Sequence, residues 1–85
     1  MKVLIPGALR SYTEASVTEA HGATLGDMLG DLDRRYAGIR FRIIDEQDRI
    51  RRHVRVFVNG AQVHDLSHGM HPADEVVIVQ ALSGG

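Results

Sequence analysis

The clearest periodic pattern along the chain is an apolar stripe with helical spacing between residues 24 and 38. Thr24, with Asp27 three positions later, is typical of a helix N-cap followed by an acidic first turn. Apolar side chains then recur on one helix face. They are Leu25, Met28, Leu29, Leu32 and Tyr36. Gly38 is suited to end the helix. The pattern predicts one amphipathic helix that packs on a sheet.

Strand patterns precede this helix. Residues 2–5 are predicted to form a first strand, with three apolar residues after Lys2, and it ends at Pro6-Gly7. Residues 14–20 alternate Ala15 and Val17 with polar neighbours, the period expected of a half-buried strand. The two runs together predict a first hairpin.

Three further strands are predicted after the helix. In residues 54–58, valines alternate with Arg55 and Phe57, as in a strand. Asn59-Gly60 is the dipeptide best suited to a tight type I′ turn, and a short return strand follows at residues 61–63. Residues 76–82 are rich in β-branched side chains and apolar at successive positions, as in a central strand.

The segment between the helix and these strands is less regular. Ile39, Phe41 and Ile43 alternate with arginines, and an acidic turn follows at residues 45–48. We expect residues 39–52 to cross from one hairpin to the other without a single defined element.

The order of these elements predicts an α+β fold of the β-grasp type. A mixed sheet of four to five strands would pack on one main helix, with the last strand between the first and the third. Residues 1–82 would form the domain, and residues 83–85 a flexible Gly-Gly tail.

Composition narrows the functions that this fold could serve. The 85 residues suffice for one domain, and a net charge of -1 gives no global attraction to nucleic acid. No cysteine is present, which excludes disulfides, thiolate metal sites and a cysteine nucleophile. No segment resembles a membrane span or a secretory signal. We therefore expect a cytoplasmic protein with neither nucleic acid nor membrane as a partner.

The final Gly84-Gly85 is the most informative dipeptide. A frayed polar end is one interpretation. The other is that an end without side chains can enter the narrow active site of another protein, because glycine has no Cβ to clash there. The predicted fold and the tail together favour the second interpretation.

Three motifs carry a resemblance that covers the whole chain: Phe57-Val58-Asn59-Gly60, Ala73-Asp74-Glu75 before the last strand, and Ser83-Gly84-Gly85. With them the chain resembles the ubiquitin-like sulfur-carrier family. That family includes the thiamine-pathway carrier, the small subunit of molybdopterin synthase and carriers for cysteine biosynthesis. The long crossing at residues 36–53 is more similar to the last two branches.

The resemblance implies that the protein is a reactant and not an enzyme. An E1-like enzyme would adenylate the carboxylate of Gly85 with ATP and Mg²⁺, which belong to that partner, while the chain itself binds no cofactor. A sulfur donor would then give a thiocarboxylate, presented on Gly84-Gly85 to an acceptor. The acceptors implied are the large subunit of molybdopterin synthase, a thiazole synthase, or a cysteine synthase with a zinc peptidase.

Strand parity predicts a docking face beside the tail. If Val54, Val56 and Val58 point at the helix, Arg55 and Phe57 point away from it. The alternative is that residues 39–50 cover this face. The family resemblance also implies docking through the sheet. The residues expected to bind partners are Arg55, Phe57, Val77, Val79, Leu82 and Ser83.

Other chemistry is weaker in the sequence. A basic stretch at residues 49–55 suits a solvated strand edge better than an RNA site. His64, His68 and His71 near Asp65 lack the spacing of a metal site, so no metal is expected. Two rival functions stay open: a non-covalent ubiquitin-like interaction module, and a protein modifier joined to amines through Gly85.

Overall fold

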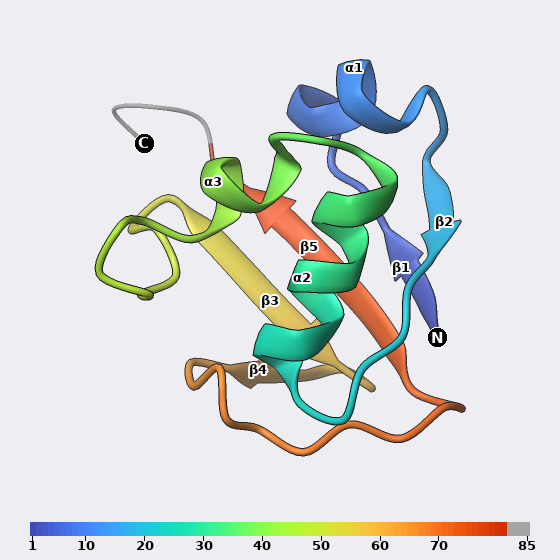
Figure 1. The fold of residues 1–85 in the computed structure, drawn as a ribbon, viewed down its shortest axis with the longest axis vertical. Helices are drawn as coiled ribbons and strands as arrows, with labels where there is room; N and C mark the ends of the chain where they lie inside the picture. Colours follow the sequence, from blue (N-terminus) through green and yellow to red (C-terminus); the bar gives the residue numbers. More distant parts are fainter. Residues whose placement is uncertain (82–85) are drawn as a thin grey trace.

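The computed structural model describes residues 1–81, which form an α+β domain with one main helix on a mixed sheet (Figure 1). The sheet has five strands in the order β2-β1-β5-β3-β4. The strands are β1 (Lys2–Leu4), β2 (Val17–Glu19), β3 (Val54–Val58), β4 (Ala61–Val63) and β5 (Glu75–Gln80). The helices are η1 (Gly7–Leu9), α1 (Arg10–Thr13), α2 (Leu25–Arg35) and α3 (Ile39–Ile43).

The last strand lies in the middle of the sheet, as predicted. β5 pairs in parallel with β1 and antiparallel with β3. Val76 and Ile78 are 0% and 2% exposed and face the helix. β3 pairs with β5 from Val76 to Gln80, whereas β1 pairs only with Glu75, Val76 and Val77, so the first half of β5 has a strand on each side and its last residues are held by β3.

Helix α2 follows the predicted pattern closely. The Thr24 Oγ1 accepts a hydrogen bond of 3.1 Å from the Asp27 N–H, which satisfies one free donor at the helix start. The apolar stripe is buried against the sheet at Leu25, Met28, Leu29 and Leu32. Tyr36 is the C-cap, and its hydroxyl lies 2.6 Å from the Thr18 Oγ1 of β2.

The predicted strand at residues 14–20 is wrong in its start and in its parity. Two helical turns, η1 and α1, occupy residues 7–13, and β2 begins only at Val17. Val17 pairs with Leu4, whose neighbour Val3 is the buried residue, so Val17 points away from the core and is 43% exposed. Thr18 takes the inward position.

The crossing segment forms a short helix instead of an alternating run. Gly38 has a positive φ of 97° and is the N-cap of α3, so it starts this helix, while α2 ends at Arg35. Ile39 and Ile43 are both buried, four residues apart on one helix face, whereas Phe41 is 56% exposed. Because these isoleucines belong to the core on the side of α2, the crossing does not cover the opposite face of the sheet.

No helix within residues 1–81 is long and apolar enough to cross a membrane.

Two neighbouring residues of β5 test the division between the two faces of the sheet. We expect Ile78→Ala to lower the free energy of unfolding by about 2–5 kcal/mol, because it leaves a cavity in the core. Val79 lies in the same strand but is 41% exposed, so Val79→Ala should lower the free energy of unfolding by less than about 1 kcal/mol. Urea unfolding measures both. Equal losses would contradict the assignment of the two faces.

Asp31 predicts a specific dependence of stability on pH. The His21 N–H donates to its carboxylate at 2.9 Å, and Arg34 donates at 2.7 Å. These bonds lower the pKa of Asp31 to about 2, from an ordinary value of about 3.9. Because the pKa is depressed in the folded state, this contribution to stability is complete above about pH 5 and is lost progressively as the pH falls towards 2.

The Asp31→Asn variant should therefore lose less stability than the parent chain between pH 4 and pH 2. Between pH 7 and pH 5 the two should change in parallel. Urea midpoints at these pH values measure the difference, and identical losses below pH 4 would contradict the prediction.

Candidate functional site: the outer sheet face and the end of the central strand

Four of the predicted docking residues lie together on the sheet face turned away from α2. Phe57 of β3 is in register with Val77 of β5, and Arg55 is in register with Val79. Arg55 and Val79 are exposed, whereas Phe57 and Val77 are partly buried. Phe57 is thus less exposed than the sequence suggested, because it is flanked in register by both Val77 and Gln62 of the edge strand β4.

The apolar surface extends further across the sheet than strand parity in β3 and β5 predicted. Leu4 of β1 pairs with Val77 on one side and with Val17 of β2 on the other. Phe57, Val77, Leu4 and Val17 therefore form one line across four strands, which we call the outer apolar row. The alternation in β1, with Val3 buried, could have revealed Leu4.

The central strand ends beside this face. β5 stops at Gln80, which pairs with Val54, and the Ala81 N–H donates a hydrogen bond of 2.8 Å to the His53 carbonyl. The chain is thereby attached to the sheet as far as Ala81. Leu82, Ser83, Gly84 and Gly85, which the sequence nominates as the tail, lie outside the described residues.

Asn59 fixes the opposite end of β5. Asn59 and Gly60 have positive φ angles of 51° and 86°, as the predicted type I′ turn requires. The Asn59 Nδ2–H donates to the Asp74 carboxylate at 2.9 Å, and the Glu75 N–H donates to the Asn59 Oδ1 at 3.0 Å. The sequence predicted only the turn and did not show that Asn59 also sets the start of the central strand.

Asp74 is correspondingly more than a turn residue. Its carboxylate accepts a 2.8 Å hydrogen bond from the His71 N–H as well as the one from Asn59. These bonds hold the pKa of Asp74 below its usual range. With both ends fixed, β5 places its exit from the sheet at a constant position relative to the outer apolar row.

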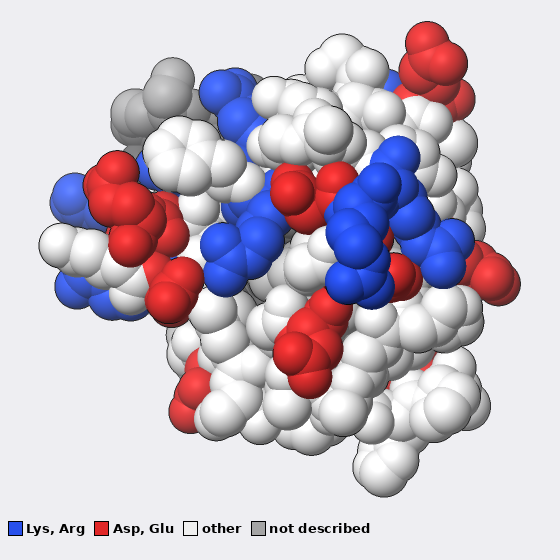
Figure 2. All heavy atoms as spheres, viewed as in Figure 1, with Lys and Arg blue, Asp and Glu red and all other residues white. Residues whose placement is uncertain are grey.

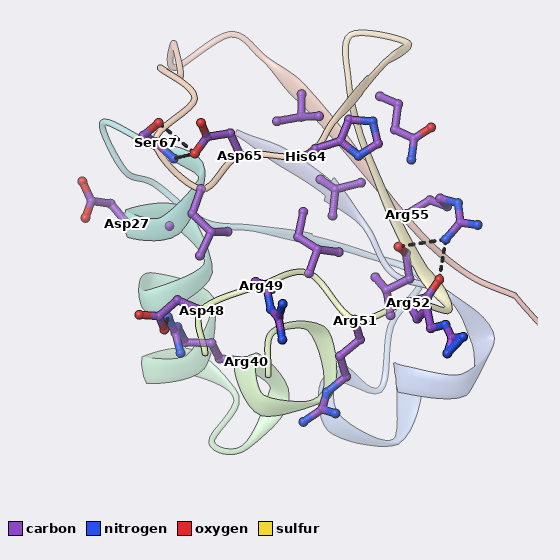
Figure 3. Close-up of a pocket in the computed structure, with 17 residues that line it drawn as sticks. Asp27, Arg40, Asp48, Arg49, Arg51, Arg52, Arg55, His64, Asp65 and Ser67 are labelled. Atoms are coloured by element: carbon purple, nitrogen blue, oxygen red, sulfur yellow. Dashed lines mark hydrogen bonds and ion pairs between the residues drawn. The ribbon is translucent and has the colours of Figure 1, made fainter. Parts of the chain in front are cut away.

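The predicted basic stretch lines a groove on the helix side of the sheet, about 1180 Å³ in volume (Figure 3). Its arginines spread around the groove and do not converge on one point. Arg40 is paired with Asp48 at 3.3 Å, and Arg55 donates to the Arg52 carbonyl at 2.7 Å. Figure 2 shows acidic and basic side chains interspersed on the face that carries α2. This is not the continuous basic surface typical of nucleic-acid binding.

The loop histidines do not gather into a metal site. Among residues 1–81, no group of three metal-ligating side chains lies together. Asp65 instead accepts hydrogen bonds from the N–H and the hydroxyl of Ser67, at 2.9 and 2.8 Å. Those bonds also keep the pKa of Asp65 below its usual range.

Comparison with known proteins matches residues 3–85 to the ThiS family. The chain is 36% identical to the sulfur carrier protein CysO of Mycobacterium tuberculosis, over 98% of this chain and 96% of that protein. The crystal structure of the Amycolatopsis orientalis BexX/CysO complex contains a chain with a TM-score of 0.90 and 33% identity, covering 99% of this chain and 98% of that one. The crystal structure of Mycobacterium tuberculosis CysO has a TM-score of 0.89 and 32% sequence identity, and the match covers 95% of this chain and 98% of that one. The predicted ubiquitin-like β-grasp fold is confirmed.

Proposed function

Because the chain belongs to the ThiS family, we propose that it is a cytoplasmic sulfur carrier that reacts at the carboxylate of Gly85. One observation carries the proposal beyond family membership. β5 stops at Gln80 and the Ala81 N–H is still bonded to the His53 carbonyl, so the sequence that follows starts from a fixed point on the sheet whose outer face carries the outer apolar row. An enzyme that docks on this row would receive the end of the chain at a defined position.

The chemistry that we propose has two steps. The Gly85 carboxylate attacks the α-phosphorus of ATP in an E1-like enzyme that also holds Mg²⁺, and pyrophosphate leaves. This gives an acyl-adenylate, which unlike a carboxylate has a good leaving group. With hydrosulfide as the simplest donor, sulfur then bonds to the acyl carbon and AMP departs with the electron pair of the broken bond. The S–H proton is lost to water, which leaves the thiocarboxylate. The protein is a reactant in both steps.

The similarity to CysO favours the cysteine branch over the molybdopterin and thiazole branches. We therefore propose a cysteine synthase as the sulfur acceptor, with a zinc peptidase that releases the product. The CysO chain of the Amycolatopsis orientalis structure is in a complex with BexX, which supports a protein partner for this chain as well. The residues proposed to contact these enzymes are Arg55, Phe57, Val77, Val79, Leu82 and Ser83.

The proposed chemistry predicts a change in intact mass. After incubation with the E1-like enzyme of the same organism, ATP, Mg²⁺ and a sulfide donor, the chain should gain about 16 Da, the difference between a sulfur and an oxygen atom. A chain lacking Gly85 should remain unmodified. A protein modifier would instead give conjugates of higher mass, and a non-covalent module would bind without any mass change; either result would refute the proposal.

The outer apolar row predicts a second effect. Phe57→Ala should raise the KM for adenylation several-fold, because it removes apolar contact area at the docking face. Its loss of folding stability should be smaller than that of Ile78→Ala, which alters the core. Steady-state adenylation and urea unfolding measure the two quantities. Unchanged KM together with a large loss of stability would show that Phe57 has a structural role only.

A further inference from the structure

A second surface lies beside the end of the central strand, and the crossing segment builds most of it. Five residues line a hollow of about 270 Å³, which we call the tail-exit surface: Phe41, Arg42, Arg51, His53 and Gln80. No aspartate or glutamate of residues 1–81 lines this hollow. Phe41 is the most exposed of the large hydrophobic residues in the described chain, at 56%. Phe41 thus offers an aromatic face beside two arginines at the edge of the hollow.

Arg51 is held in one orientation on this surface. Its Nε–H donates to the Phe41 carbonyl at 2.7 Å, and its guanidinium carbon lies 4.6 Å from the centre of the Phe41 ring. The terminal guanidinium nitrogens of Arg51 have no acceptor within residues 1–81, and the same is true of the exposed Arg42. An arginine whose side chain is already ordered loses less conformational freedom when it binds a carboxylate.

The position of this surface ties it to the end of the chain. His53 contributes its carbonyl to the hydrogen bond with the Ala81 N–H, and Gln80 is the last residue of β5. Val79 points to the outer face of the sheet and Gln80 to the other face. The chain therefore leaves the sheet between the outer apolar row on one side and the tail-exit surface on the other.

The positive charge of this region is concentrated in one segment of the chain. Six of the ten lysine and arginine residues lie within residues 40–55, although the whole chain has a net charge of -1. Arginine forks pair with carboxylates in a bidentate manner. A carboxylate-bearing protein surface fits better than RNA, because the cations are local to this region and the chain lacks, on the face that carries α2, the continuous basic surface typical of nucleic-acid binding.

We propose that the tail-exit surface binds an acidic rim around the active-site opening of the enzyme that receives the tail. Carboxylates of that rim pair with Arg42 and Arg51, and an apolar group packs on Phe41. The inference rests on the proposed function, and it adds a second contact region near the end of β5, apart from the outer apolar row.

The test measures the KM of this protein in adenylation by the E1-like enzyme of the same organism. Arg42→Glu should raise the KM at least about fivefold at about 50 mM salt and less than twofold at about 500 mM, with kcat unchanged, because salt screens the pairing. Phe41→Ala should raise the KM at both salt concentrations. Arg34→Glu, the same change of charge on α2, should leave the KM within about twofold of the parent value.

The outcomes separate this inference from the proposed function. Thermal unfolding confirms that Arg42→Glu is folded, as expected for an exposed side chain. Adenylation of the parent chain with an unchanged KM for Arg42→Glu and Phe41→Ala overturns the inference alone. Absence of adenylation of the parent chain overturns the proposed function and the inference with it. The surface would be assigned to nucleic acid if the parent chain binds single-stranded RNA in a gel-shift assay and Arg42→Glu does not, while the KM for adenylation stays unchanged. That result would overturn the inference.

Discussion

The structure depends on the placement of the last strand between β1 and β3. Backbone pairing on both edges fixes β5, and two further contacts define its ends: Asn59 with Asp74 and Glu75 at the start, and the His53 carbonyl with Ala81 at the finish. Buried backbone groups are costly to leave unpaired, so this arrangement cannot slip in register without losing several hydrogen bonds. The end of the chain therefore starts from a fixed position, although the fold is small.

A sheet covered by one helix has a face that the domain cannot bury. The stripe of α2 and the isoleucines of the crossing fill the core on one side. The other side of the sheet keeps the outer apolar row, which runs across four strands. A contiguous apolar line that residues 1–81 leave uncovered is suited to a partner. It lies on the same sheet whose central strand leads to the terminal glycines, so docking and delivery of the tail would be coupled by geometry.

The distribution of charged side chains over the surface shows why the net charge of the chain says little about which partners a domain of this size binds. Acidic and basic side chains are interspersed over α2, where several are paired within the helix, as Asp31 is with Arg34 and Arg35. Around the end of β5, Arg42 and Arg51 form no ion pair with a carboxylate of residues 1–81. Electrostatic interactions in salt act over about 10 Å, so a partner senses the local arrangement and not the sum.

Much of this architecture followed from the sequence because local patterns decide it. The spacing of Leu25, Met28, Leu29 and Leu32, the Thr24 cap and the Asn59-Gly60 turn each specify their element through contacts between near neighbours. The β-branched run that became β5 marked the central strand by being apolar on both faces. The sequence also drew attention to the terminal Gly84-Gly85, because a tail without side chains is evident from the residues themselves, and the reaction at Gly85 stays a prediction.

Where a local sequence pattern is compatible with two different structures, only the tertiary structure decided which one forms. Ile39 and Ile43 satisfy both a strand of period two and a helix of four-residue spacing, and burial against α2 selected the helix. Val17 alternates correctly, but pairing with Leu4 turned it outward. The contacts of Asn59 with Asp74, and of Phe41 with Arg51, join residues ten or more positions apart. Local periodicity carries no information about such distant pairs, because only chain packing brings them together.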